Sequence, residues 1–141
     1  ASDAHVVRLI PSRIYSAAFH PSSGPVVAWV GGKHGHLGAW RPALAESDPE
    51  GACSVFQPHN APLSGIVIPP SQPTRIFTTS YDMCLRMMDA EKGTSSEIAI
   101  WDARIHYLTV QEGGNVIYFC TTAGEFVRTD IREPLRSTKK P

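Results

Sequence analysis

Short apolar segments alternate with turn residues along the whole chain. The segments are rich in β-branched and aromatic residues and end at Gly, Pro, Asn or Ser, which is the pattern of β-strands joined by turns. No sustained helical periodicity competes with this pattern. The pattern therefore predicts an all-β protein with strands at residues 4–10, 14–20, 26–30, 36–40, 53–56, 63–68, 75–79, 84–88, 97–101, 105–110, 116–120 and 126–130.

Three stretches of the chain repeat one arrangement of strands and turns. Leu37, Leu85 and Phe126 stand at equivalent points of the last strand of each stretch, 48 and 41 residues apart. A period of about 40 to 45 residues with four strands per unit is typical of β-propeller blades. We therefore predict a partial β-propeller over residues 1–135, followed by a tail or linker at 136–141, with repeats at about 5–42, 53–92 and 96–134.

Three blades are too few to close a ring, because propellers need roughly four to eight. We therefore expect an open arc of a larger ring, with two sheet faces and their edges left for other units. The small and acidic residues of 43–52 account for the longer first spacing. They predict a solvated loop, with a short helix as the alternative.

The composition narrows the classes of function. The 13 Lys and Arg balance the 13 Asp and Glu, so the formal net charge of zero disfavours non-specific attraction to nucleic acid or anionic membranes. The three Cys form no C-x-x-C pair, which favours a reducing compartment over a disulfide framework or a metal site. With no signal peptide and no membrane-spanning run in view, we expect a soluble protein without a membrane partner.

One His and one Asp stand at a spacing that indicates a structural pair. His59 lies four residues before Leu63, and Asp82 ends a strand in the triplet Ser-Tyr-Asp, six residues before Met88. A carboxylate buried in a tight turn accepts hydrogen bonds from a His ring and from backbone amides, at about 1.5 to 3 kcal/mol per charged bond. We therefore predict that His59 and Asp82 hold the fold together and are not a catalytic dyad.

The other two repeats keep less of this pattern. Repeat one has His34 in the place of the turn Asp, and repeat three has Ala123 there. His34 and His36 lie on alternate positions and could face one metal ion, but no Cys or carboxylate stands beside them at ligand spacing. No phosphate-binding loop, nucleophile elbow or H-E-x-x-H motif is present. We therefore expect no enzyme activity, no metal, no cofactor and no small-molecule substrate.

With this register the chain resembles WD-repeat proteins of the damage-specific DNA-binding type, the damage-specific DNA-binding protein 2-like family. The resemblance extends over roughly residues 10–135 and is stronger in the first two repeats than in the third. It is carried by residues 13–22, 35–40, 58–59, 62–64, 80–82 and 85–86.

The resemblance implies a nuclear, chromatin-associated propeller with about three of seven blades in this chain. It implies binding to DNA or damaged chromatin, and a role as substrate receptor of the cullin-4 ubiquitin ligase through damaged-DNA-binding protein 1. An alternative stays open, in which the chain is a generic WD-repeat platform that binds a peptide and has no DNA role.

In such receptors the adaptor contact uses Asp-x-Arg directly after the last strand of a blade, and Asp130 and Arg132 match it. The alternative is that Asp130 only holds its own turn. Arg41 and residues 89–91 depart from the motif in the other repeats. Residues 101–104 spell the docking sequence Trp-Asp-Ala-Arg, but Trp101 lies 19 residues after Asp82 and by register belongs to an outer strand. A shifted register would restore it.

DNA contacts are expected from the loops just ahead of the innermost strands. Arg13 and Arg104 occupy comparable places in two of these loops, and both could contact phosphates. The alternative is that each pairs with a neighbouring carboxylate.

Overall fold

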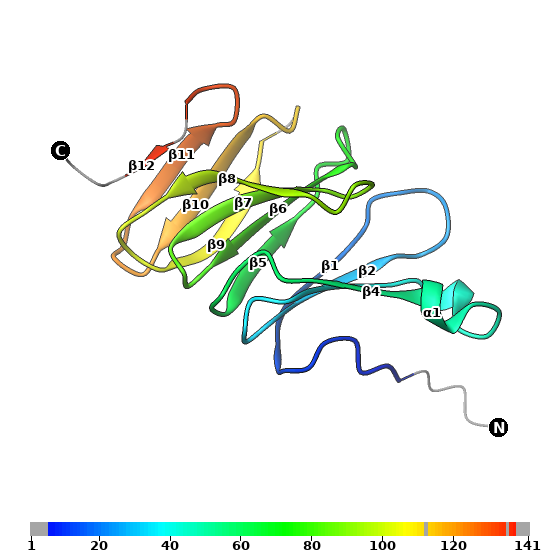
Figure 1. The fold of residues 1–141 in the computed structure, drawn as a ribbon. Helices are drawn as coiled ribbons and strands as arrows, with labels where there is room; N and C mark the ends of the chain where they lie inside the picture. Colours follow the sequence, from blue (N-terminus) through cyan, green and yellow to red (C-terminus); the bar gives the residue numbers. More distant parts are fainter. Residues whose placement is uncertain (1–5, 112, 135, 138–141) are drawn as a thin grey trace.

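The computed structural model describes residues 6–111, 113–134 and 136–137 of the 141-residue chain. Within these residues two short helices interrupt a chain that is otherwise strands and turns (Figure 1). The helices are η1 (Pro42–Leu44) and α1 (Pro49–Ala52). The strands are β1 (Ile14–Phe19), β2 (Ala28–Gly32), β3 (Leu37–Trp40), β4 (Cys53–Phe56), β5 (Leu63–Val67), β6 (Arg75–Ser80), β7 (Cys84–Asp89), β8 (Ser95–Ile100), β9 (Ile105–Val110), β10 (Val116–Thr121), β11 (Phe126–Asp130) and β12 (Arg136–Ser137).

The strands form three sheets that follow one another in chain order. The first sheet has the order β1-β2-β3-β4, the second has β5-β6-β7-β8 with β12 added beside β8, and the third has β9-β10-β11 in the described residues. All pairs are antiparallel except the β12–β8 pair. Figure 1 shows the three sheets side by side, with β1–β4 at one end of the arc and β9–β11 at the other. The predicted all-β, partial β-propeller fold with three antiparallel blades is confirmed.

Each sheet is offset by one strand from the sequence repeat. β4 and β8, which open the predicted repeats at 53–92 and 96–134, pair with β3 and β7 and so close the preceding sheet. The expected strand at residues 4–10 is wrong for its described part, because residues 6–10 form no strand. The edge of β3 is occupied by β4, and the adjacent residues Leu9 and Ile10 are both buried against the first sheet, which an alternating strand does not allow.

Two further segments differ from the expected loops. Within residues 43–52 the short-helix alternative holds for α1, which Asp48 caps by accepting a hydrogen bond from the Gly51 N–H at 3.0 Å. Residues 136–137, the start of the expected tail, pair in parallel with β8. The rest of that tail, residues 138–141, lies outside the described residues, as do residues 1–5, 112 and 135. No helix in the described part of the chain is long and apolar enough to cross a membrane.

The core consists of two apolar layers, each between neighbouring sheets. Successive residues of the central sheet point to opposite sides, so Ile76 faces the first sheet while Phe77 faces the third. This explains why β6 is buried from Ile76 to Ser80. The first layer comprises Trp29, Leu37, Ala39, Leu63, Ile66, Ile68, Ile76 and Met88, and the second Phe77, Leu85, Ala99, Ile105, Leu108, Ile117 and Phe119.

The innermost strands β1, β5 and β9 lie beside one another, with β5 in contact with both others. A serine hydroxyl joins each neighbouring pair. Ser16 Oγ donates to the Leu63 carbonyl at 2.7 Å, and Ser64 Oγ donates to the Ile105 carbonyl at 2.6 Å. Leu63 and Ile105 are each the first residue of an inner strand, so the same junction is built twice.

The turns between the second and third strands of the three sheets are equivalent. Each has one residue with left-handed backbone at the same place, and Leu37, Leu85 and Phe126 follow two residues later. Leu37, Leu85 and Phe126 therefore occupy equivalent positions, each at the start of the third strand of its sheet. The left-handed residues are Gly35, Met83 and Gly124, with φ values of 88°, 71° and 82°.

Candidate nucleic-acid and adaptor surfaces

The inner strands begin at the same end of the sheets as the turns just described. In the first sheet the Lys33 N–H donates to the Arg13 carbonyl at 2.8 Å, and in the third the Thr122 N–H donates to the Arg104 carbonyl at 2.9 Å. The Tyr81 N–H makes the corresponding bond to Pro62 at 3.0 Å. These three bonds define one face of the arc, which we call the turn face.

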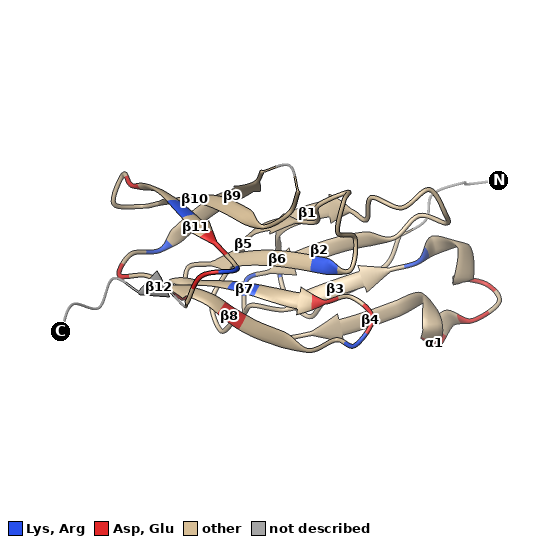
Figure 2. Cartoon of the chain, turned by 90° about the horizontal axis from the view of Figure 1, so that it is seen from above, with Lys and Arg blue, Asp and Glu red and all other residues tan. Residues whose placement is uncertain are grey.

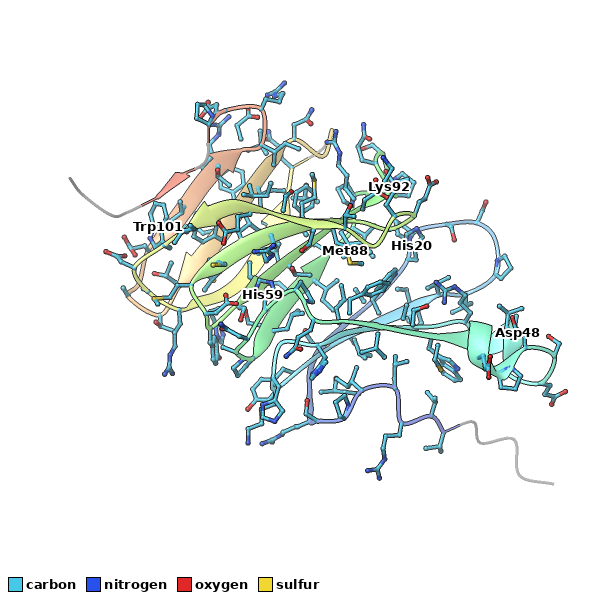
Figure 3. All side chains as sticks on the ribbon, in the orientation of Figure 1. His20, Asp48, His59, Met88, Lys92 and Trp101 are labelled. Carbon is cyan, nitrogen blue, oxygen red and sulfur yellow. The ribbon has the colours of Figure 1, made fainter. Side chains whose placement is uncertain are left out.

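His59 and Asp82 meet on the turn face, as the sequence predicted. His59 is 4% exposed, and its Nδ1 lies 2.9 and 3.2 Å from the two carboxylate oxygens of Asp82. A carboxylate can only accept, so Nδ1 carries the proton. On the other side of the ring, Nε2 lies 2.8 Å from the Thr78 hydroxyl. Figure 3 labels His59 in the segment that connects the first and second sheets.

Asp82 also closes its own turn. Its carboxylate accepts from the backbone N–H groups of Asn60 and Cys84 at 3.3 and 3.1 Å. Burial by itself raises the pKa of Asp82, but the hydrogen bond and electrostatic attraction of His59, together with the two N–H groups, hold that pKa below its ordinary value. Both ring nitrogens of His59 and both carboxylate oxygens of Asp82 thus have a hydrogen-bond partner within the fold.

The same position is filled differently in the other sheets. The position four residues before the inner strand is occupied by Ile10 before β1, by His59 before β5 and by Trp101 before β9. Trp101 packs edge-on against Phe119, the counterpart of Thr78, with ring centroids 5.5 Å apart. An apolar contact in the third sheet therefore replaces the polar network of the second. Sequence reasoning missed Thr78, although its place four residues before Asp82 was readable once the register was known.

Residues 101–104 therefore lie where the register predicted. Trp101 directly follows the outer strand β8 and donates its backbone N–H to the Met83 carbonyl at 2.8 Å. Its indole N–H donates to Glu125 at 3.1 Å. The segment lies on the turn face, at the opposite end of the sheets from the ends of the third strands.

Arg13 and Arg104 both lie on the turn face, directly before β1 and β9. Arg13 stacks over the Tyr15 ring at 5.7 Å, and Arg104 stacks over the Tyr81 ring at 5.6 Å. The ion pairs among the described residues join His59 to Asp82, Arg86 to Glu97 and Arg132 to Asp130. Within that part of the chain, then, neither Arg13 nor Arg104 is held by a carboxylate.

Asp130 and Arg132 lie at the other end of the third sheet. Asp130 pairs with Val116 where β10 begins, whereas Ile105 pairs with Thr121 where β10 ends, so the length of the sheet separates Asp130 from Arg104. Five or six residues of strand correspond to roughly 17 to 20 Å. The two candidate surfaces therefore face in opposite directions, and we call the second one the docking face.

A bidentate ion pair joins Arg132 to Asp130. Arg132 Nε and Nη2 donate to the two carboxylate oxygens at 2.8 and 2.6 Å, and its backbone N–H donates to the same carboxylate at 2.9 Å. These bonds hold the pKa of Asp130 well below its ordinary value. The Asp130 side chain is 8% exposed and that of Arg132 is 65% exposed, so the carboxylate fixes an outward guanidinium.

Asp89 is the counterpart of Asp130 in the second sheet. Its carboxylate accepts from the backbone N–H groups of Glu91 and Lys92 at 2.8 and 2.9 Å. Glu91 stands where Arg132 stands in the third sheet, so the second sheet has the turn without the guanidinium. Holding a turn is thus common to both carboxylates, while orienting an arginine is particular to Asp130.

The described residues contain neither a candidate metal site nor a surface stripe of like charges. No cluster of three potential metal ligands occurs among the described residues, and the three Cys are free thiols. Burial and the negative charges of Asp82 and Glu97 raise the pKa of the Cys84 thiol to about 11. Figure 2 shows Lys and Arg positions dispersed among Asp and Glu positions along the arc.

Repeated antiparallel blades, equivalent left-handed turns and a buried His–Asp–Thr network define the class of protein by its fold: this is a partial β-propeller. No protein-family model matches the chain. Curated relatives nevertheless share its sequence over most of its length.

These relatives are fungal proteins named for binding damaged DNA. The chain is 33% identical over 152 residues to the DNA damage-binding protein cmr1 of Aspergillus oryzae, covering 91% of this chain and 28% of that protein. It is 33% identical over 144 residues to the protein of the same name from Debaryomyces hansenii, covering 94% of this chain and 24% of that protein. The chain is 28% identical over 143 residues to the Scheffersomyces stipitis protein of the same name, covering 94% of this chain and 28% of that protein. The chain spans about a quarter of the length of these relatives.

Proposed function

We propose that this chain is part of a non-enzymatic nuclear propeller that binds DNA or damaged chromatin through its turn face. The similarity to three proteins named as DNA damage-binding carries this proposal. The exposed guanidinium groups of Arg13 and Arg104 support it, because each stacks on a tyrosine and neither is held by a carboxylate in the described part of the chain. An arginine that stacks on a ring but pairs with no carboxylate keeps its N–H donors available for phosphate oxygens.

The proposal extends to the docking face. There we propose that Arg132, oriented by Asp130, contacts damaged-DNA-binding protein 1 and makes the protein a substrate receptor of the cullin-4 ubiquitin ligase. A planar guanidinium fixed by a nearly buried carboxylate loses little side-chain freedom when a partner binds. Within the damage-specific family, we propose WD repeat-containing protein 76 as the nearest counterpart and this chain as about three repeats of such a ring.

A salt titration of duplex DNA binding by the full-length protein tests the first part. Phosphate contacts release counterions, so log Kd should rise steeply with log salt, by about 0.9 per phosphate. The double variant Arg13→Ala/Arg104→Ala should bind more weakly at low salt and lower the slope by up to about 2. Lys92→Ala/Arg128→Ala, which removes two exposed charges from the turn after β7 and from β11, is the matched control. A slope unchanged in the first variant would contradict the proposed contacts.

Capture of damaged-DNA-binding protein 1 tests the second part. Arg132→Ala should abolish or strongly weaken capture while the melting temperature stays close to that of the parent protein, because the side chain is exposed. Arg128→Ala removes the same charge from β11, the strand that precedes Arg132, and should leave capture unchanged. Equal capture by the two variants would remove the docking role.

A second candidate function is a peptide-binding WD-repeat platform without a DNA role. The formal net charge of zero and the dispersed charges favour it, because both weaken long-range attraction to DNA. In the same salt titration this function predicts no saturable duplex binding.

A further inference from the structure

Three planar side chains meet on the turn face where the second and third sheets join. Tyr81 belongs to the turn between β6 and β7, Arg104 directly precedes β9, and His106 is the second residue of β9. The Arg104 guanidinium lies over the Tyr81 ring at 5.6 Å. The His106 ring lies nearly parallel to the Tyr81 ring, with an interplanar angle of 14° and centroids 6.5 Å apart.

The fold holds the backbone under these side chains in place. The Tyr81 N–H donates to Pro62 at 3.0 Å, and the two residues beside Tyr81 are fixed by the contact from Ser80 Oγ to the Ala61 carbonyl and by the His59–Asp82 pair. Arg104 accepts the N–H of Thr122 through its carbonyl. The group is therefore preorganised before any ligand arrives.

The side chains themselves are open to solvent. Arg104 and His106 are exposed, and Tyr81 is partly buried beneath them. The fold does not require such a group, because the junction between the first and second sheets has Lys33, Pro62 and Ser64 at the corresponding positions. That junction is packed and hydrogen-bonded without an aromatic ring at any of these three positions.

We propose that Tyr81, Arg104 and His106 form a stacking platform for an unpaired base of a nucleic acid. This inference rests on the proposed DNA-binding function and adds the feature of DNA that is read. Aromatic rings and guanidinium planes stack on any base, and a base that is mismatched or extruded exposes its π-face at the least cost. Arg13 and Lys33, on the same turn face, are placed to contact the flanking phosphates.

The test compares two DNA duplexes that differ by one unpaired 2-aminopurine, using the full-length protein. We expect tighter binding to the duplex with the unpaired base, by about 5- to 150-fold, and quenching of its fluorescence on binding. Stacking involves no counterion release, so this preference should persist as salt lowers the affinity for both duplexes.

Four variants separate stacking from charge and from folding. Tyr81→Ala should remove the preference and the quenching, whereas Tyr81→Phe should retain both. Arg104→Lys keeps the charge without the plane and should lower the preference more than the affinity for the paired duplex. His106→Ala changes an exposed residue, so it should fold normally and still reduce the preference.

Lys33→Ala is the control for charge alone, and it should weaken binding to both duplexes by the same factor. Equal affinity for the two duplexes, or a preference that survives Tyr81→Ala and His106→Ala, would overturn the platform while leaving DNA binding intact. Absence of binding to either duplex would overturn the proposed function and the platform together. Binding of a trimethyl-lysine peptide in place of the unpaired base would assign the rings to a peptide and equally overturn the inference.

Discussion

At the scale of single residues, the His59–Asp82–Thr78 network shows how polar side chains are buried with their hydrogen bonds satisfied. Three side chains from a connecting segment, a turn and a strand satisfy one another's hydrogen bonds. The sequence predicted the His59–Asp82 pair, because spacing from a strand and a turn is preserved along the chain. It did not single out Thr78, since a threonine in an apolar strand is also a common packing residue.

The lowered pKa of Asp82 predicts a dependence of stability on acid pH. The unfolded state binds a proton more readily than the folded state, so this carboxylate stabilises the fold above its unfolded pKa of about 4 and loses that contribution as pH falls below it. Asp82→Asn should lower the free energy of unfolding at pH 7 by about 1.5 to 3 kcal/mol. Urea denaturation between pH 7 and pH 3 should give a smaller acid loss in Asp82→Asn than in the parent. In Asp102→Asn, an exposed control, the acid loss should match the parent's.

The equivalent turn glycines should differ sharply in their tolerance of a side chain. A Cβ at Gly35 would lie 2.1 Å from the His59 carbonyl oxygen, whereas at Gly124 it would meet nothing within 4 Å. Both have positive φ, which costs a non-glycine residue about 1 to 2 kcal/mol. We expect Gly124→Ala to cost only this amount and Gly35→Ala to cost about 1 to 3 kcal/mol more. Thermal denaturation of both variants measures the difference, and equal losses would contradict the close approach.

At the scale of elements, the strand that opens the second repeat closes the first sheet, and the strand that opens the third repeat closes the second sheet. β4 pairs with β3 and β8 pairs with β7, so the connection that follows each outer strand joins two sheets. Residues such as His59 and Trp101, which lie in these connections, therefore bridge neighbouring blades (Figure 3). The stability of the packing between neighbouring sheets should therefore depend on hydrogen bonds that join one inner strand to the next, such as those of Ser16 and Ser64.

The serine at the second junction gives a direct test of this dependence. Ser64→Ala removes the donor to the buried Ile105 carbonyl and should destabilise the protein by about 1 to 3 kcal/mol. Ser96→Ala, in an exposed position of β8, should have little effect. Urea unfolding of the two variants measures the difference, and indistinguishable midpoints would show that this hydroxyl does not hold the junction.

At the scale of the whole molecule, the arc has two different ends as well as two different faces. The outward sides of the first and third sheets expose large apolar residues, with Phe19 75% and Phe126 72% exposed. Tyr118 stacks on Phe126 with centroids 5.4 Å apart, so the apolar surface at that end is continuous. The second sheet is covered on both sides, and its strands β5–β8 expose no large apolar side chain.

These end faces predict self-association when the 141 residues are produced alone. Exposed apolar sheet faces bind other apolar surfaces, so sedimentation should show mass rising with concentration. Phe19→Ser/Phe126→Ser should shift the chain toward monomer, while Val26→Ser, an exposed apolar residue in the connection between β1 and β2, should not. A chain that stays monomeric at high concentration would contradict this prediction.

The sequence by itself determined the all-β fold, every expected strand except the one at residues 4–10, and the pairing of His59 with Asp82. These features depend on local alternation and on spacing along the chain, which the amino-acid order contains directly. It also placed Arg13, Arg104, Asp130 and Arg132 at strand ends, though their roles stay proposals.

Only the tertiary structure decided which sheet each outer strand joins, because strand pairing is set by competition between edges that are distant in sequence. It alone brought Tyr81 to Arg104 and His106, residues more than 20 positions away, and it separated the turn face from the docking face. The physical reason is that packing between sheets acts across the chain, and one sequence pattern is compatible with several such arrangements until the apolar layers are buried.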